Sequence, residues 1–270
     1  MDTQFTTLPR PGTGVPHAYG DQVHLLSFPY PMAMLTRLCQ QQTHQPEINH
    51  LVAALYDWML SEVSSRILRT RTVKRPTRMA AMHSEGIYAG ECIDETQRVV
   101  VVDIARGGIL PAHRLYHGLH HLIEAEQLRQ DHIIASRTTD SDGRVTGVDI
   151  SASKIGGGVE DATVLIPDPM AATGTSVSAV IDRYKRLPGG PPRQIATLHL
   201  IATPEYIARM RADHPEVHIF VIRLDRGLSS SEALSTPPGT RPDAEVGLNN
   251  TQYIVPGAGG VGELLNNAWV

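Results

Sequence analysis

The chain has 270 residues, 41% of them hydrophobic, which is enough for one large domain or one domain with an appendage. Its formal net charge of −4 disfavours a general affinity for nucleic acid or for anionic membrane surfaces. The N-terminus lacks the layout of a signal peptide, no apolar run approaches the roughly 20 residues that cross a bilayer, and Cys39 and Cys92 show no pairing pattern. We therefore expect a soluble protein of the reducing cytoplasm.

The first hundred residues contain two helical patterns behind a polar N-terminal segment. Residues 1–22 are rich in Pro, Gly and Thr and predict an arm with little independent structure, so the folded domain is expected to span 23–270. A helix is expected over 31–42, and a longer apolar stripe predicts an amphipathic helix over 46–68 that packs on the core or on a second subunit. Residues 70–96 mix charges with glycines, and we expect a pair of short strands there.

From residue 99 onward, aliphatic runs alternate with apolar helical patterns. Strands separated by helices predict a parallel sheet with helices on both faces, and such sheets bind ligands at the carboxyl ends of their strands. The expected strands cover 99–104, 133–136, 163–166, 194–202 and 217–224, and the expected helices cover 109 to about 128, 177–187 and 204–212.

Two polar segments interrupt this alternation. Residues 137–158 are too many and too hydrophilic for a simple connection, and long loops in compact domains are usually functional. A solvated charged hairpin is the plainer alternative for this segment. Residues 228–247 are rich in Ser, Pro and Thr and predict a mobile insert loop.

The segment 162–178 carries the densest chemistry in the sequence. A buried strand over 163–166 stops at Pro167-Asp168-Pro169, because proline removes backbone donors from the ladder. The small-residue turn Ala171-Ala172-Thr173-Gly174-Thr175-Ser176 then leads into a helix. Backbone N–H groups, hydroxyls and the helix N-terminus would converge on a phosphate, while Asp168 could accept hydrogen bonds from sugar hydroxyls beside it. The turn taken alone also fits an ordinary capped connection between a strand and a helix.

The string DPMAATGTS, which begins at Asp168, closely resembles the DPMLATGGS motif with which the uracil phosphoribosyltransferases bind phosphoribosyl pyrophosphate (PRPP). The resemblance implies an α/β type I phosphoribosyltransferase fold, with a parallel five-stranded sheet flanked by helices and a small hood built from the termini. It also implies a homodimer or higher homo-oligomer, Mg²⁺ carried with PRPP, and a small base as the acceptor.

Two further segments resemble the pyrophosphate loop and the flexible loop of this family. DIARGGI corresponds to the family's PILRAGL, which puts Arg106 on the family's arginine and Asp103 in place of its proline. Arg137 falls on the arginine of the family's YRDE segment, and Lys154 falls on the lysine of YYxKLP, although Ser151-Ala152 replace the tyrosine pair. A cation on a mobile loop can close over pyrophosphate and exclude water.

The C-terminal string YIVPGAGGVGE has two candidate interpretations. Its glycines fit the GxGxxG pattern of a dinucleotide fold, but only eight residues follow Gly262, too few for the helix, strand and acid that this fold requires. The string is more similar to the family's uracil segment, YIVPGLGDAGDR, in which backbone groups read the pyrimidine edge. Here Gly260 replaces the family's Asp, which contacts the PRPP side of the site, and Glu263-Leu264 replace its Asp-Arg pair.

The resemblance assigns roles to individual residues. The catalytic set is Asp168, Arg106 and Arg137. The 5′-phosphate would lie on Thr173 to Ser176, the ribose hydroxyls on Asp168, and the leaving pyrophosphate on the cationic side chains. The full PRPP-binding set is Arg106, Gly107, Asp168, Pro169, Met170, Ala171, Ala172, Thr173, Gly174, Thr175, Ser176 and Lys154, and the base-binding set is Tyr253, Ile254, Gly259, Gly260 and Val261.

A row of histidines offers a different site. His113, His117 and His121 recur at a spacing of four residues on an expected helix, and this spacing can hold a divalent metal. No carboxylate or cysteine is placed to complete the shell. We therefore expect an exposed or interface histidine face and assign no metal ligand to the protein.

Three functions are consistent with these features. The first is pyrimidine salvage, in which uracil and PRPP give UMP and pyrophosphate. The changed uracil segment and the Ser/Pro insert favour a second, a phosphoribosyltransferase relative that acts on a different acceptor in specialised metabolism. The third is a non-catalytic regulator that binds nucleotide and RNA, which would need a basic face that the acidic balance argues against.

Overall fold

A computed structural model of the chain describes residues 5–139 and 145–269. Its centre is an eight-stranded sheet in the order β1-β10-β9-β7-β4-β5-β6, with β8 paired to β9 outside this path. The pairings within it are parallel, except that β5 and β6 are antiparallel. The strands are β1 (Val23–Leu25), β4 (Val99–Ala105), β5 (Leu128–Thr139), β6 (Val145–Lys154), β7 (Thr163–Pro167), β8 (Met170–Ala171), β9 (Gln194–Ala202) and β10 (His218–Leu224).

The five strands β5, β4, β7, β9 and β10 are those expected from the sequence, and they confirm the predicted parallel α/β core. β4 and β7 are runs of aliphatic residues that are buried along almost their whole length. This is the pattern of strands that are covered on both faces. β1 adds a short parallel strand at one edge, and β6 folds back along β5 at the other.

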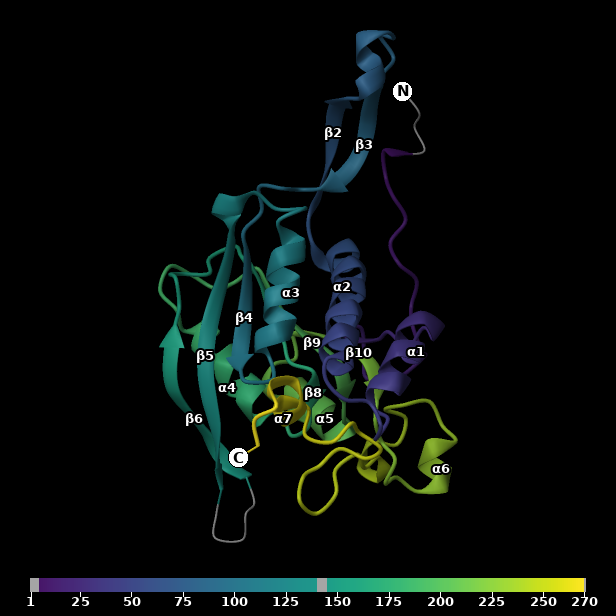
Figure 1. Cartoon of the computed structure of the whole chain (residues 1–270), viewed down its shortest axis with the longest axis vertical. Helices are drawn as coiled ribbons and strands as arrows, with labels where there is room; N and C mark the ends of the chain where they lie inside the picture. Colours follow the sequence, from purple (N-terminus) through teal and green to yellow (C-terminus); the bar gives the residue numbers. More distant parts are fainter. Residues whose placement is uncertain (1–4, 140–144, 270) are drawn as a thin grey trace.

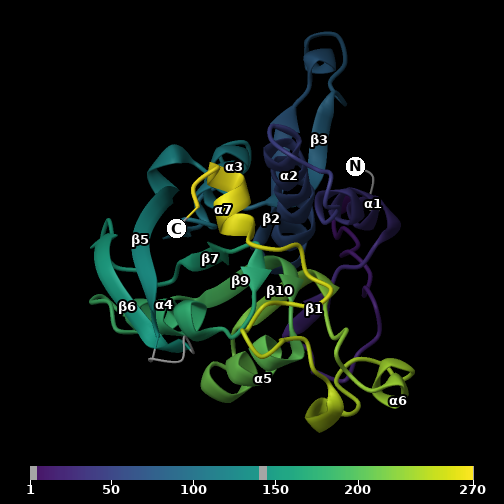
Figure 2. The same cartoon turned by 60° about the horizontal axis from the view of Figure 1, so that its bottom comes forward.

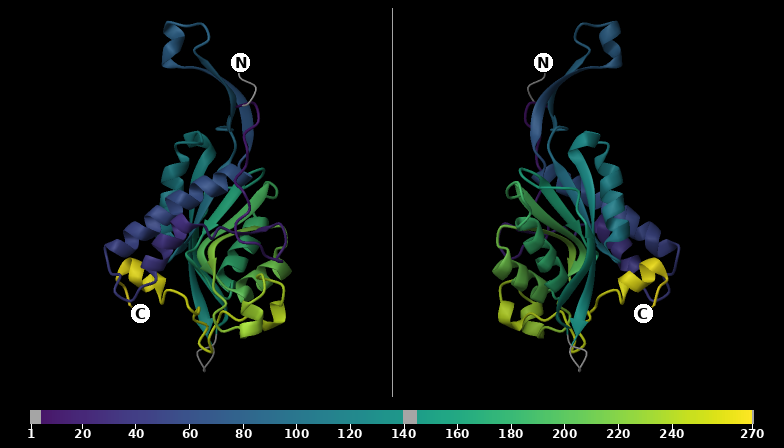
Figure 3. Two further views of the ribbon diagram at one scale, coloured as in Figure 1. Left: turned by 90° about the vertical axis from the view of Figure 1, so that its right-hand side faces the viewer. Right: turned by 90° about the vertical axis from the view of Figure 1, so that its left-hand side faces the viewer.

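Helices cover both faces of the sheet (Figures 1 and 3). One face is covered by α1 (Pro29–Leu38), α2 (Glu47–Ile67) and α3 (Ile109–Leu119), whose apolar residues share one hydrophobic cluster with the sheet. The opposite face is covered by α4 (Thr175–Lys185) and α5 (Pro204–Asp213), which pack in a second cluster. None of the described helices is both long and apolar enough to cross a membrane.

The hood that the resemblance implied is formed where the two ends of the chain meet. α7 (Val261–Asn266) packs near α2, as Figure 2 shows, and shares its hydrophobic cluster. Gln45, which precedes α2, donates from Nε2 to the carbonyl of Leu264 at 2.7 Å. N-terminal and C-terminal elements therefore lie together over the carboxyl ends of the strands.

The region 70–96 is a hairpin, as expected. β2 (Thr70–Pro76) and β3 (Ile87–Ile93) pair antiparallel, and a 3-10 helix, η2 (Arg78–Ala81), lies between them. The hairpin projects from the end of the molecule opposite to the carboxyl ends of β4 and β5 (Figure 1).

Two segments differ from the expectation. α3 ends at Leu119 rather than near residue 128, because the chain turns through a second 3-10 helix, η3 (Ala125–Gln127), to enter β5. Ile123 extended the apolar pattern in the sequence, but it is buried in this turn instead. The stretch 137–158 is mainly a β-hairpin rather than a long loop, because β5 continues to Thr139 and β6 runs back along it; its residues 140–144 lie outside the described part.

The insert 228–247 and the N-terminal arm are tied together. The insert carries α6 (Ser231–Leu234) and a 3-10 helix, η4 (Pro242–Ala244). The buried carboxylate of Glu245 accepts hydrogen bonds from Arg226 at 2.8 Å, from the N–H of Gly239 at 2.9 Å and from the hydroxyl of Tyr19. The segment expected to be a mobile loop therefore has a buried anchor, which includes a residue of the arm.

Candidate active site

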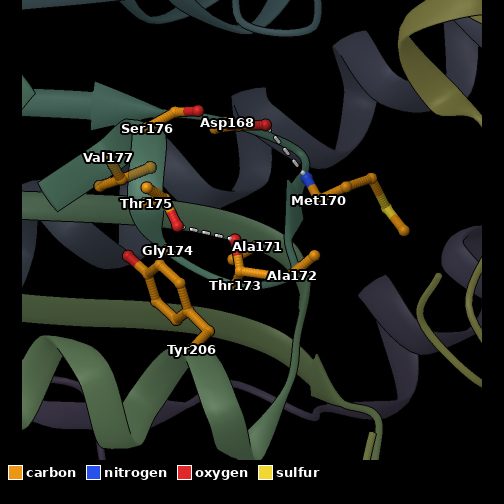
Figure 4. Close-up of a pocket in the computed structure, with 10 residues that line it drawn as sticks. All are labelled: Asp168, Met170, Ala171, Ala172, Thr173, Gly174, Thr175, Ser176, Val177 and Tyr206. Carbon is orange, nitrogen blue, oxygen red and sulfur yellow. Dashed lines mark hydrogen bonds between the residues drawn. The ribbon is translucent and has the colours of Figure 1, made fainter. Parts of the chain in front are cut away.

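A pocket opens at the carboxyl end of β7 (Figure 4). The chain leaves the β7 ladder at Pro167, passes through Asp168 and β8, and enters α4 at Thr175. Ten residues line the pocket: Asp168, Met170, Ala171, Ala172, Thr173, Gly174, Thr175, Ser176, Val177 and Tyr206. All of them except Val177 and Tyr206 belong to the PRPP-binding set expected from the sequence, and Pro169 of that set is buried beside them.

The turn into α4 has the geometry of an anion cradle. Gly174 adopts a left-handed φ of 79°, and a Cβ placed there would lie 3.1 Å from both Tyr206 Cδ2 and Arg209 Cδ. The hydroxyl oxygens of Thr173 and Thr175 face each other at 3.1 Å (Figure 4). Arg209 donates from Nε to the carbonyl of Thr173 at 2.8 Å and so fixes the turn from α5. Together with the N-terminus of the 11-residue α4, these groups suit a phosphate.

A buried hydrogen-bonded chain supports Asp168 from within the sheet. His199 Nδ1 lies 2.6 Å from the backbone carbonyl of Asp168, and His199 Nε2 lies 2.7 Å from the hydroxyl of Tyr206. A carbonyl oxygen only accepts, so Nδ1 carries the hydrogen and Nε2 of the neutral ring accepts from Tyr206. Burial lowers the pKa of His199 to about 4, which keeps the ring neutral.

The turn after β4 brings Arg106 beside this pocket. A Cβ placed at Gly107 would lie 3.7 Å from Asp168 Oδ1, so the turns that follow β4 and β7 are neighbours. Arg106 donates from Nη1 to the carbonyl of Ala268 at 3.1 Å, and its Nη2 lies 3.9 Å from Glu263 Oε1. The backbone of this turn therefore adjoins the candidate sugar site, and the guanidinium of Arg106 contacts the C-terminal segment.

The other predicted cations lie on the β5–β6 hairpin. Arg137 is on β5 opposite Val148, and its side chain falls outside the described part of the structure. Lys154 ends β6 opposite His132, is exposed, and has no hydrogen bond or ion pair among the described residues. The structure thus places both cations on one hairpin without bringing Lys154 onto the pocket of Figure 4.

Asp103, which stands at the position of the family's proline, is buried on β4. Its carboxylate accepts a hydrogen bond from His132 Nδ1 on the neighbouring β5. Burial raises the pKa of Asp103, and the contact with His132 partly offsets that rise. The partner across the sheet explains how this strand accommodates an acid.

The loop that carries the predicted base-binding residues is fixed by Arg223 and Asp225. These side chains form a bidentate pair, with nitrogen–oxygen distances of 2.6 and 2.8 Å. Asp225 accepts the N–H of Gly257 at 2.7 Å, and Arg223 donates to the carbonyl of the same residue at 3.2 Å. An antiparallel bridge between Leu248 and Ile254 holds the preceding part of the loop.

The members of the base-binding set differ in exposure. Tyr253 is 58% exposed at the start of the loop, whereas the side chain of Val261 is buried in the core beside Leu265. Only the backbone of Val261 could therefore face an acceptor. Gly259 and Gly260 lead directly into α7.

Two of the three histidines lie on α3, and His121 lies just beyond its end. His113, His117 and His121 are exposed, and the ring centroids of the first two are 6.5 Å apart. Among the described residues, no group of three or more His, Cys, Asp or Glu side chains lies close enough together to hold a metal ion.

Sequence reasoning missed the residues that support the site from behind. His199 and Tyr206 lie under Asp168, and Arg223 and Asp225 lie under the C-terminal loop. For His199, Arg223 and Asp225 the signal in the sequence was a polar side chain within or directly after an apolar strand, as at His199 in LHLI. Such a residue needs a buried partner, but the sequence does not say which.

Comparisons with known proteins agree with this geometry. A profile of the family described as "Uracil phosphoribosyltransferase" matches residues 26–240. The uracil phosphoribosyltransferase of Thermococcus sibiricus is 27% identical over 87% of this chain and 85% of its own length. That of Pyrobaculum arsenaticum is 28% identical over 89% of this chain and 97% of its own length.

Among solved structures, the AQ2163 protein from Aquifex aeolicus matches with a TM-score of 0.69 at 21% identity, covering 92% of this chain and 99% of that one. This likeness shows a shared fold. The family profile covers most of the chain, including the pocket and the turn that carries Arg106. The protein is therefore a phosphoribosyltransferase that belongs to the uracil phosphoribosyltransferase family.

Proposed function

We propose that this enzyme transfers the phosphoribosyl group of PRPP to N1 of uracil, giving UMP and pyrophosphate. The observation that carries the proposal is the pocket of Figure 4, in which an acid and a hydroxyl-lined turn share the N-terminus of α4. A phosphorylated sugar needs both features, one for its hydroxyls and one for its phosphate. The names of the relatives support uracil as the acceptor at about 27% identity.

On the donor side, the 5′-phosphate lies on Thr173 to Ser176 and the ribose hydroxyls lie on Asp168. The pyrophosphate extends toward Arg106, whose turn adjoins Asp168. The bond from C1′ to the pyrophosphate oxygen breaks as the bond from C1′ to N1 of the base forms, and the N1 proton passes to water. Positive charge develops on the sugar ring and negative charge on the leaving group, so that catalysis is mainly positioning and charge stabilisation.

The hairpin cations and Mg²⁺ complete the donor site in this proposal. Arg137 and Lys154 lie on a two-stranded hairpin beside the sheet edge, from which they would close over the pyrophosphate. The Asp168 carboxylate and the hydroxyls of Thr173 and Thr175 are hard oxygen donors, which fits a hydrated Mg²⁺ that arrives with PRPP. When bound, the ion would neutralise part of the pyrophosphate charge.

On the acceptor side, the C-terminal loop has backbone groups without a hydrogen-bond partner among the described residues, and these favour a pyrimidine as the acceptor. The bridge to Leu248 uses the carbonyl of Tyr253 and the N–H of Val255, and the side chains of Asp225 and Arg223 hold Gly257. The N–H and C=O of Ile254 make no hydrogen bond among the described residues. One donor and one acceptor on the same residue complement the alternating carbonyls and N–H of a pyrimidine edge.

A different acceptor is the second candidate, and the C-terminal loop itself favours it. Gly260 and Glu263-Leu264 change the charge and shape of the segment that leads into α7. The insert 228–247 also borders this loop, because the N–H of Val255 donates to the carbonyl of Gly247, the last residue of the insert, at 2.8 Å. Such changes near the acceptor would alter the choice of base.

The test is to incubate the protein with PRPP and Mg²⁺ and a panel of pyrimidines, purines and other heterocycles, following pyrophosphate release. Release that depends on uracil supports the first proposal. Release that depends on another acceptor and not on uracil supports the second. Binding of PRPP without release for any acceptor would contradict both.

A further inference from the structure

The carboxylate of Glu263 occupies the space that a side chain at residue 260 would need. A Cβ built on Gly260 would collide with Glu263 Oε2 and would lie 3.2 Å from Glu263 Cδ. Glu263 is in the first turn of α7, three residues after Gly260, and residues at this spacing are neighbours on a helix. The lack of a side chain at residue 260 therefore allows the carboxylate to fold back over the loop.

From this position the carboxylate faces Arg106. Glu263 Oε1 lies 3.9 Å from Arg106 Nη2, while Arg106 Nη1 donates to the carbonyl of Ala268 at 3.1 Å. The N–H of Ala268 in turn donates to the carbonyl of Glu263 at 3.2 Å. One continuous C-terminal segment thus provides both partners of the guanidinium.

We propose that Glu263 is the resting counter-ion of Arg106 and that the pyrophosphate of PRPP displaces it when the donor binds. This inference rests on the proposed function, which assigns Arg106 to the pyrophosphate. The guanidinium is a planar fork with a limited set of donors, so a carboxylate on one side of it competes with an incoming anion. Glu263 is therefore a positioning residue that sets how tightly the site holds PRPP and how readily it releases pyrophosphate.

The size of the effect follows from exposure. The side chains of Arg106 and Glu263 are 37% and 32% exposed, so solvent screens their attraction. Partly exposed ion pairs contribute up to about 1 kcal/mol, which corresponds to a change in dissociation constant of roughly two- to fivefold. The proposal concerns affinity for the donor end of the site, and it is therefore tested without an acceptor.

The experiment measures the binding of Mg-pyrophosphate and of Mg-PRPP by calorimetry, without any acceptor. Glu263→Gln should bind both ligands about two- to fivefold more tightly than the natural protein. Glu126→Gln is the matched control, because it removes the same charge from the exposed end of η3 and should change neither affinity. Unchanged or weaker binding by Glu263→Gln would overturn the proposal.

A second variant separates charge from position. Gly260→Ala keeps the carboxylate but places a Cβ against it, so the flexible end of Glu263 must swing away from the loop. It should tighten pyrophosphate binding in the same direction, and the double variant should gain little beyond Glu263→Gln alone. Full additivity would show that the two residues act independently and would contradict the shared mechanism.

The outcome also distinguishes this inference from the proposed function. If the natural protein binds neither PRPP nor pyrophosphate, both fail together. If it binds both ligands and releases pyrophosphate in the presence of a base, while Glu263→Gln shows no tightening, only the counter-ion role of Glu263 is wrong.

Discussion

His199 donates from Nδ1 to the backbone carbonyl of Asp168 at 2.6 Å, and this bond ties the acid of the candidate site to the neighbouring strand β9. Both His199 and its second partner, Tyr206, are fully buried. A shift of the Asp168 backbone would therefore leave polar groups unsatisfied inside the core, which is costly. The turn that ends β7 is held in place by the sheet behind it as well as by its prolines.

Replacing Tyr206 with Phe should test this support. The change leaves His199 Nε2 as a buried acceptor without a donor, which should lower the free energy of unfolding by about 1–3 kcal/mol. The KM for PRPP should rise more than kcat falls, because the change moves Asp168 without removing it. Urea denaturation and steady-state kinetics measure the two effects. Tyr30→Phe, at a tyrosine that is 65% exposed, is the control and should change neither the stability nor the KM. If Tyr206→Phe keeps full stability and an unchanged KM, Tyr206 does not support Asp168.

Replacing Asp168 with Ala should abolish most turnover while the fold survives. The carboxylate is proposed to accept hydrogen bonds from two ribose hydroxyls, each worth about 1.5–3 kcal/mol for a charged acceptor, so kcat/KM should fall roughly 100-fold or more. Circular dichroism and thermal unfolding check the fold, and pyrophosphate release gives the kinetics. Asp182→Ala, on the exposed side of α4, is the control. Kinetics that match the natural protein would remove Asp168 from the site.

The core could be predicted from the sequence because burial on both faces leaves a simple pattern. β4 and β7 are mostly aliphatic and buried, with Asp103 as the one charged residue among them, and the chain between them carries an amphipathic helix. The pocket could be predicted for a related reason, since prolines at 167 and 169 and the glycine at 174 are local signals that act within a few residues.

The supporting contacts could not be predicted, because they join residues that are far apart in the sequence. The carboxylate of Asp103 accepts a hydrogen bond from His132. The guanidinium of Arg106 donates to the carbonyl of Ala268 and faces the carboxylate of Glu263. The sequence of 137–158 predicts a hairpin only as the alternative to a long functional loop, for a different reason. β6 lies at the edge of the sheet, and the part of β5 beyond Ile134 pairs with β6 alone, so the apolar signal of a strand buried on both faces is missing there.

Acid should destabilise the edge of the sheet at β1 and β10. His24 stacks on Phe220 with ring centroids 4.4 Å apart, and burial, followed by the neighbouring His218, lowers the pKa of His24 to about 4. Burial also lowers the pKa of His218. Both pKa values lie below the ordinary 6.5, so the unfolded chain takes up protons first as the pH falls. Stability contributed by the neutral ring of His24 should therefore be lost between about pH 6.5 and 4, at most about 1.4 kcal/mol per pH unit, and the neutral ring of His218 should add to this loss below pH 6.5.

Thermal unfolding measured from pH 7.5 to 4.5 checks this expectation. His24→Phe keeps an aromatic ring on Phe220 and removes one titrating group, so it should flatten the dependence on pH. His113→Gln, at an exposed histidine of α3, should leave the slope unchanged. A melting temperature that stays constant down to pH 4.5 would contradict the role of these two histidines.

Asp225→Asn should loosen the acceptor loop and leave the donor pocket intact. Asp225 is 1% exposed in its pair with Arg223 and accepts the N–H of Gly257, so the variant leaves a buried guanidinium without its charge partner. The acceptor KM should rise about tenfold and the free energy of unfolding should fall by about 3 kcal/mol, while the affinity for PRPP should stay within about twofold.

Asp131→Asn is the matched control, because Asp131 forms the same bidentate pair with Arg129 outside the pocket. Asp131→Asn should lose comparable stability and keep its acceptor KM. If both variants raise the acceptor KM equally, the cause is general destabilisation, and Asp225 does not specifically hold the loop.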